Sequence, residues 1–168
     1  MNNQHNLPGA DQDTPFGRAI AFVWHEAELL DSKQYTAWGA LWAEDGHYVV
    51  PIDPDTTDFA STLNYAYDDA RMRQLRIERF TSGFSMSAAD SAVTVRTVSR
   101  FTLVEAVGDE IEVRSAQLLA AYKRGTTTLF AGNLTHRIRM TPEGPRLVRK
   151  VVRLVNSQDA LNALGFLL

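Results

Sequence analysis

Few residues in this chain could do acid–base chemistry, and the histidines come first among them. They are His5, His25, His47 and His136. No two of them are spaced to bind one metal ion from adjacent turns of a helix, and no carboxylate completes a ligand set with two of them. We therefore predict no metal site, and no catalytic residue apart from the pocket candidates considered next.

His136 is the histidine whose position suggests a role. It alternates with Ile138, so a strand through this segment would place the imidazole on an apolar face. A histidine in such a place is more often a core residue with satisfied hydrogen bonds. The alternative is a general acid or base in a pocket, paired with Asp45 or with a tyrosine such as Tyr48 or Tyr122, because such a partner would tune its pKa toward neutrality.

The amino-acid inventory excludes several classes of function. The chain has no cysteine, which excludes an iron–sulfur cluster, a thiolate zinc site, a cysteine nucleophile and a redox pair. The same absence fits a cytoplasmic protein, which we expect here. A net charge of −3 provides no electrostatic footprint for nucleic acid. No apolar run approaches about 18 residues, so we expect no spanning helix and no membrane partner.

The cationic residues are biased toward arginine. Only three of the 17 are lysine, so 14 are arginine. A high-GC genome would explain this, but arginine is also enriched at interfaces, where its planar guanidinium pairs with carboxylates. The candidate interface residues lie on the charged segment 68–79, on the strands and at the apolar C-terminus: Asp69, Arg73, Arg76, Arg79, Arg96, Arg100, Phe166 and Leu168.

Two helices are predicted in the first quarter of the chain. Thr14 can cap the first helix, Pro15 suits its first position, and apolar residues recur at helical spacing over residues 16–30. The shorter second helix carries Trp38 and Trp42 at core positions. These elements supply the helical layer of the fold.

The next segment is predicted to turn, extend briefly and become helical again. Residues 44–46 are typical of a turn, and residues 47–51 of a short strand. The pattern over residues 64–83 predicts a third helix, with Asp69 and Arg73 spaced for an ion pair and Gly83 as its C-cap.

Long strands dominate the second half of the chain. Residues 92–155 alternate with period two, and the breaks between the runs are short. In the first run, apolar residues including Val93 and Val95 share one parity, and the Gly108-Asp109 pair that ends it is typical of a type II′ hairpin. Residues 142–145 predict another turn.

The order of these elements defines the expected fold class. Helices first and long strands afterwards indicate an α+β fold. We expect a cone-shaped, strongly curved antiparallel sheet with the N-terminal helices packed across it, because long sheets twist and curl. Residues 1–15 are predicted to be a flexible arm, and residues 16–168 a single domain.

The chain resembles a known family, the small (beta) subunits of aromatic-ring-hydroxylating dioxygenases, over residues 16–168. The segments that carry the resemblance are Glu26-Ala27-Glu28-Leu29-Leu30-Asp31, Tyr67-Asp68-Asp69-Ala70-Arg71-Met72, Leu75-Arg76-Ile77-Glu78-Arg79, Val95-Arg96-Thr97-Val98-Ser99, Arg146-Leu147-Val148-Arg149-Lys150 and Phe166-Leu167-Leu168. Residues 94–100 depart from the family, which often has a histidine and an asparagine there.

The resemblance implies a cystatin-like cone shared with nuclear-transport-factor-2-like proteins. It also implies assembly with a large alpha subunit, typically as an α3β3 hexamer. In that family the alpha subunit carries the Rieske 2Fe-2S cluster, the mononuclear iron and the substrate pocket, and the beta subunit is mainly structural and holds no cofactor. The absence of cysteine agrees, because a Rieske centre needs two cysteines and two histidines.

Three classes of function are therefore weighed. The first is the non-catalytic beta subunit of an oxygenase that dihydroxylates aromatic compounds, with the chain itself forming a homotrimer. The second is a stand-alone cone-fold enzyme, such as a dehydratase, isomerase or cyclase, which would use His136 in an enclosed pocket. The third is a ligand-binding or scaffold protein with the same fold.

Overall fold

The computed structural model describes residues 13–82, 92–159 and 165–168 of the chain. Most of the predicted flexible arm and the predicted C-cap Gly83 lie outside these residues. None of the helices within them is long and apolar enough to cross a membrane.

Three helices form the helical layer: α1 (Pro15–Asp31), α2 (Tyr35–Ala40) and α3 (Ala70–Thr81). The predicted start of α1 is confirmed, because the Thr14 side chain accepts a hydrogen bond from Gly17 N at 3.0 Å and Pro15 occupies the first position. Ile20, Val23, Ala27 and Leu30 of the stripe are buried and Phe16 is partly buried, so this face of α1 belongs to the core.

Six strands form one sheet in the order β2-β1-β6-β5-β4-β3. Their bounds are β1 (Trp42–Pro51), β2 (Asn64–Asp68), β3 (Val93–Val107), β4 (Glu110–Lys123), β5 (Thr126–Thr141) and β6 (Gly144–Leu154). Neighbours pair antiparallel except β1 and β6, which run parallel. The predicted antiparallel pairing is confirmed for every pair but this one, which makes the sheet mixed.

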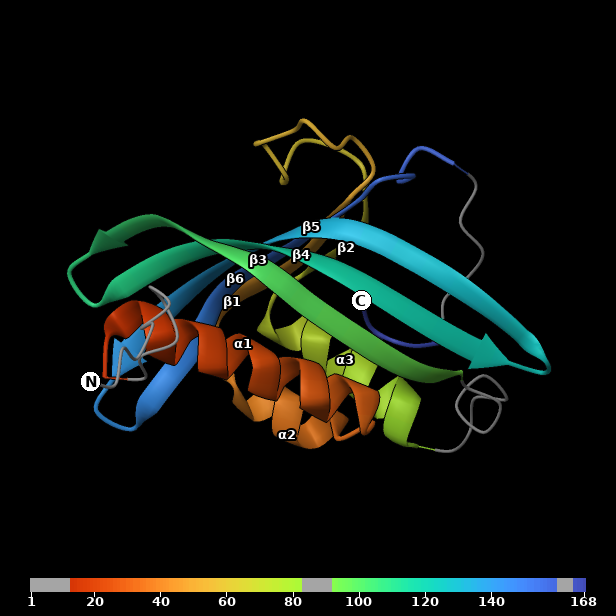
Figure 1. Cartoon of the computed structure of the whole chain (residues 1–168), viewed down its shortest axis with the longest axis horizontal. Coiled ribbons are helices and arrows are strands. Elements are labelled where there is room, and N and C mark those ends of the chain that lie inside the picture. The colour runs from red at the N-terminus through yellow and green to blue at the C-terminus, as the bar shows by residue number, and fades with distance from the viewer. Residues whose placement is uncertain (1–12, 83–91, 160–164) are drawn as a thin grey trace, which may run out of the picture.

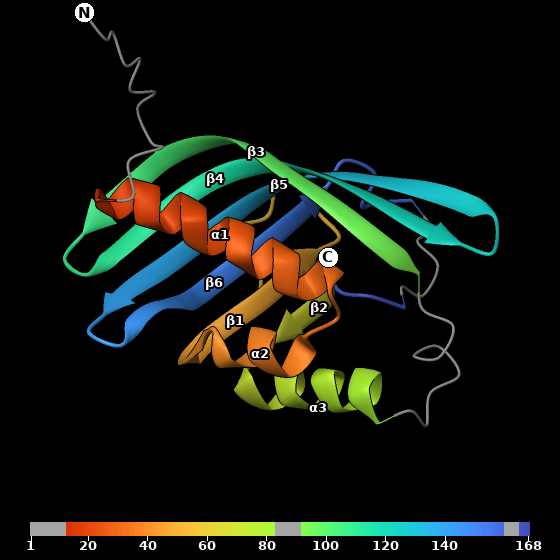
Figure 2. The same ribbon diagram turned by 60° about the horizontal axis from the view of Figure 1, so that its bottom comes forward.

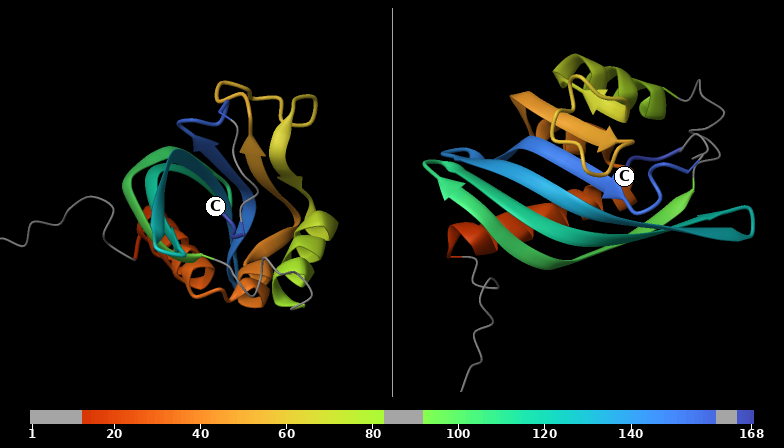
Figure 3. Two further views of the ribbon diagram at one scale, coloured as in Figure 1. Left: turned by 90° about the vertical axis from the view of Figure 1, so that its right-hand side faces the viewer. Right: turned by 90° about the horizontal axis from the view of Figure 1, so that it is seen from above.

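The sheet curves around the helices, and the predicted α+β cone is confirmed. Figure 1 shows the helices gathered on one side of the sheet, and Figure 2 shows α1 lying across the strands on that side. The loop of residues 52–63 lies on the opposite side, which we call the outer face. The left view of Figure 3 looks along the strands and shows their curvature around the helices.

Two boundaries in the first half differ from the prediction. The turn expected at residues 44–46 is an irregularity inside β1, which begins at Trp42 and shifts register against β6 before His47. A side chain at Gly46 would come within 2.7 Å of Leu147 O, so only glycine fits this close approach. The expected helix 64–83 is a strand followed by a shorter helix, in which Asp69 is the N-cap and accepts from Met72 N at 2.8 Å.

The parity that Val93 and Val95 share in β3 belongs to its outer face. Thr94, Arg96 and Val98 point inward, whereas Val93 and Val95 are more than 60% exposed. Arg100 adopts a positive φ of 55°, and the β3–β4 register shifts between Ser99 and Thr102, as at a β-bulge. The outer face of this strand therefore carries large apolar side chains.

Candidate functional sites: a buried polar cluster and the outer face of the sheet

A buried polar cluster lies inside the cone, between α1 and the sheet. Glu26 of α1 accepts from Lys150 Nζ of β6 at 2.8 Å and from Trp38 Nε1 at 2.9 Å, both through Oε1. Its other oxygen lies 3.1 Å from His136 Nε2 of β5. None of Glu26, His136 and Lys150 is more than 1% exposed. The cluster joins the helix to two central strands.

Local sequence explains why these polar groups point inward. Glu26 lies three residues after Val23 and four before Leu30, so it falls on the buried stripe of α1. His136 and Lys150 face each other across β5 and β6, and both point to the helical side. Sequence reasoning found His136 from its alternation but missed Glu26 and Lys150, although the helical spacing of Glu26 was a usable signal.

The electrostatics of the cluster favour an ion pair beside a neutral imidazole. Burial acts to raise the pKa of Glu26, but the Lys150 ammonium and then His136 outweigh it and hold that pKa below its usual range. Burial lowers the pKa of His136 and of Lys150, and the Glu26 carboxylate offsets this only in part. His136 Nδ1 has no hydrogen-bond partner among the described residues.

The partners predicted for His136 are wrong. Asp45 lies on the outer face and forms two hydrogen bonds with Arg139, at 3.1 and 3.0 Å. Tyr48 Oη is buried and bonded to the backbone of Leu168, and burial raises the pKa of Tyr48 to about 12. Tyr122 is half exposed.

The burial of His136 argues against the stand-alone enzyme, which would need this side chain in an open pocket. The exposed fraction of His136 is 0%, so its side chain has no contact with solvent. Acid–base catalysis needs the imidazole within hydrogen-bond distance of a substrate atom. The cluster therefore has the chemistry of a general base but no room for a substrate beside it.

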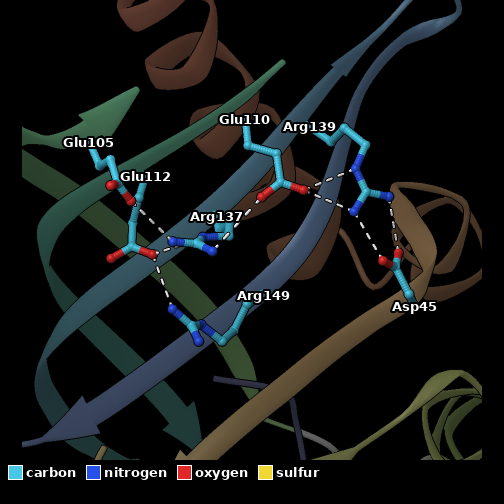
Figure 4. A network of polar contacts seen from close by, with 7 residues as sticks. All are labelled: Asp45, Glu105, Glu110, Glu112, Arg137, Arg139 and Arg149. Atoms are coloured by element: carbon cyan, nitrogen blue, oxygen red, sulfur yellow. Dashed lines mark hydrogen bonds and ion pairs between the residues drawn. The ribbon is translucent and has the colours of Figure 1, made fainter. Parts of the chain in front are cut away.

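The second candidate site is an ion-pair network on the outer face (Figure 4). Arg137 Nε and Arg149 Nη2 both reach Glu112 Oε2, at 3.1 and 3.0 Å. Next to them Arg139 pairs with Glu110 at 2.9 Å and, bidentately, with Asp45. The hydrogen bond from Arg139 is the largest cause that lowers the pKa of Asp45. Arg137, Arg139 and Arg149 are thus neutralised within the chain.

Several of the predicted interface residues have partners inside the chain instead. Arg96 is paired with Asp31 and donates to Leu167 O. Arg76 forms two hydrogen bonds with Asp68, at 2.5 and 2.9 Å. These carboxylates belong to the same chain rather than to a neighbour, which corrects the expectation that these arginines await intersubunit partners.

Of the other predicted interface residues, some are buried within their own chain and some are exposed. The expected Asp69–Arg73 ion pair is not formed, because Arg73 is buried, stacks 4.3 Å from the Trp42 ring and donates to Gly46 O. Phe166 and Leu168 are also buried in the core of their own chain. Arg79 and Arg100 are exposed, and their contact with another subunit stays a prediction.

A curved sheet packed against helices, with a sealed polar cluster between them and a charged outer face, defines a cone-shaped α+β fold. The comparisons agree. The family model of the ring hydroxylating beta subunit matches residues 25–159. The chain is 32% identical over 130 residues to the small oxygenase component of the p-cumate 2,3-dioxygenase system of Pseudomonas putida, covering 76% of this chain and 72% of that protein.

Solved structures give the same result for the fold. The beta subunit of the benzoate 1,2-dioxygenase from Burkholderia mallei superposes with a TM-score of 0.73 at 22% identity, covering 89% of this chain and 95% of that one. A nuclear-transport-factor-2-like protein with a cystatin-like fold from Novosphingobium aromaticivorans gives 0.59 at 20% identity, covering 83% and 81%. The chain belongs to the family of ring-hydroxylating dioxygenase beta subunits.

Proposed function

We propose that the chain is the non-catalytic, structural beta subunit of a multicomponent Rieske non-haem iron oxygenase that dihydroxylates aromatic compounds. The observation that carries the proposal is the family match over residues 25–159. The similar proteins are named for the oxidation of p-cumate and benzoate, which are both aromatic acids. An aromatic compound is therefore the substrate class of the complex.

The partner in this proposal is the large alpha subunit, and the iron centres belong to it. A Rieske centre requires two cysteine and two histidine ligands, and this chain contains no cysteine. The chain itself forms a homotrimer within the complex, which works in the cytoplasm. The homotrimer is supported by the outer face of the sheet, where a neighbouring copy would cover large exposed side chains.

The stand-alone enzyme receives no support from the geometry of the cluster. His136 is enclosed on all sides, and its partner Glu26 already binds Lys150 and Trp38. We assign Glu26, His136 and Lys150 to holding α1 on the sheet. The function lies in presenting surfaces to other subunits.

Co-expression with the large alpha subunit of a Rieske oxygenase tests the proposal. We expect the two chains to co-purify in equal amounts, and all of the iron to follow the large subunit when the chains are separated. The variant His136→Gln should keep the turnover of the complex once its folding is verified by circular dichroism. Stoichiometric iron on this chain alone, or turnover by this chain alone, would overturn the proposal.

A further inference from the structure

A groove of about 280 Å³ runs between α1 and β3. Figure 1 shows β3 as the edge strand beside α1. One wall is formed by Trp24, Ala27, Glu28 and Asp31 of α1, and the other by Arg96 and Val98 of β3. Because Arg96 and Val98 point to the helical side of the sheet, the groove lies on that side and not on the outer face.

Trp24 is a fixed but exposed aromatic side chain in this groove. It is 53% exposed, whereas Trp38 and Trp42 are buried in the core. Its Nε1 donates to Val98 O at 3.0 Å, and its ring packs edge-on against Phe101 with the ring centroids 5.8 Å apart. These two contacts hold the indole in one orientation. A rigid aromatic ring loses little conformational entropy on binding, and tryptophan is enriched among the residues that dominate interface affinity.

Glu28 supplies a free negative charge beside this ring. It lies one helical turn after Trp24, so the two side chains share a face of α1. Glu28 is exposed, and its carboxylate forms no hydrogen bond or ion pair within the part of the chain that the structure describes. Asp31, in contrast, is paired with Arg96 and also accepts from Arg96 N at 2.8 Å. The groove therefore offers one uncompensated carboxylate next to an aromatic face.

We propose that this groove docks an arginine side chain of the large alpha subunit, with the guanidinium stacked on the Trp24 indole and paired with the Glu28 carboxylate. A planar guanidinium makes both contacts at once, because it stacks on aromatic rings through its face and pairs with carboxylates through its edge. The inference rests on the proposed function, which supplies the large subunit. It adds the place of the contact on this chain and the chemistry of the partner group.

The position and the charge of the groove select this occupant. In the proposed function, neighbouring copies of the chain cover the outer face of the sheet. The groove lies on the opposite, helical side, so it stays open to a different partner in such a ring. A purely apolar partner would bury Glu28 without a counter-charge, which costs free energy. The partner group must therefore be cationic.

Affinity measurements between the full chain and the large alpha subunit test the contact. Trp24→Ala should raise the dissociation constant roughly thirtyfold, as is typical of a residue that anchors an interface. Glu28→Arg should raise it roughly tenfold or more, because two guanidiniums would then meet in the groove. Glu28→Gln should have a smaller effect and should flatten the salt dependence of binding, since salt screens the ion pair that this variant lacks.

Two control variants match these changes. His25→Ala truncates the exposed ring next to Trp24 outside the groove, and Glu44→Arg reverses an exposed charge on β1. Neither should change the dissociation constant. Circular dichroism verifies the folding of every variant, because Trp24→Ala also loses the hydrogen bond to Val98 O. If Trp24→Ala fails to fold, Glu28→Arg decides the question, since no polar partner of Glu28 lies within the described residues.

The outcomes separate the groove from the proposed function. Binding of the large subunit that Glu28→Arg and a folded Trp24→Ala leave as tight as their controls would overturn this contact alone. A wild-type chain that does not bind the large subunit would overturn the proposed function and the contact together. Sedimentation velocity on the chain alone tests the other occupant: variants that dissociate its homo-oligomer would place a second copy in the groove and overturn the assignment to the large subunit.

Discussion

Lys150 Nζ lies 2.8 Å from Glu26 Oε1, and solvent screens neither charge, because both residues are only 1% exposed. The pair joins the second turn from the end of α1 to the centre of β6. Such a buried pair is a weak source of net stability but a strong penalty when only one partner is removed. The pair therefore fixes the position of α1 relative to β6.

Removal of one partner should be costly. We expect Glu26→Leu to lower the free energy of unfolding by about 3–5 kcal/mol, because Lys150 would remain buried without its counter-charge. The double change Glu26→Leu with Lys150→Met should recover much of this loss, since apolar residues of similar size can replace a buried pair. Urea unfolding followed by circular dichroism measures both. Glu28→Leu, exposed two residues away, is the control, and a double variant no more stable than Glu26→Leu would contradict the assignment.

Stability should fall as the pH drops from 7 to 5. Burial lowers the pKa of His136 in the folded chain, whereas the unfolded imidazole titrates at about 6.5. Below that pH the unfolded state binds a proton that the folded state does not, so the free energy of unfolding decreases, by up to about 1.4 kcal/mol per pH unit. The depressed pKa of Glu26 adds a second loss below its ordinary value of 4.5. His136→Gln should flatten the profile between pH 7 and 5, and an equally steep profile would argue against a buried neutral histidine.

Arg96 should act on the fold rather than on assembly. Its side chain is 1% exposed and its guanidinium binds Asp31, whose carboxylate also accepts from Thr94 Oγ1 at 2.9 Å. We expect Asp31→Asn to cost about 2–3 kcal/mol of unfolding free energy, because a buried guanidinium loses its charged partner while some hydrogen bonding remains. Thermal unfolding and sedimentation on the same samples distinguish the two roles. A variant with an unchanged melting temperature but a weakened oligomer would restore the original interface interpretation.

The outer network should be nearly neutral for stability. Glu112→Gln removes the carboxylate that Arg137 and Arg149 share, yet both arginines are about one-third exposed. Solvent screens such pairs, so we expect a loss of about 1 kcal/mol or less that shrinks further in 0.5–1 M salt. Unfolding at two salt concentrations measures this loss. A loss of unfolding free energy above about 2 kcal/mol would contradict a network that solvent screens.

Local sequence determined the parts of this protein that depend on neighbours along the chain. The cap at Thr14, the stripe of α1 and the turn at Gly108 follow from spacing and residue type, and so does the inward direction of His136. The family resemblance followed from the order of short segments. Each of these signals spans one element, in which side-chain direction repeats with a fixed period.

Only the tertiary structure decided which elements meet. Glu26 and His136 are 110 residues apart, and no local pattern selects Glu26 over Asp45 as the partner. The parallel pairing of β1 and β6 likewise depends on where the chain returns. The bulge at Arg100 changes which residues of β3 face outward, because a one-residue slip moves every later side chain to the other face. The outward direction of the β3 residues beyond Arg100 therefore became known only with the register, which contacts between distant strands set.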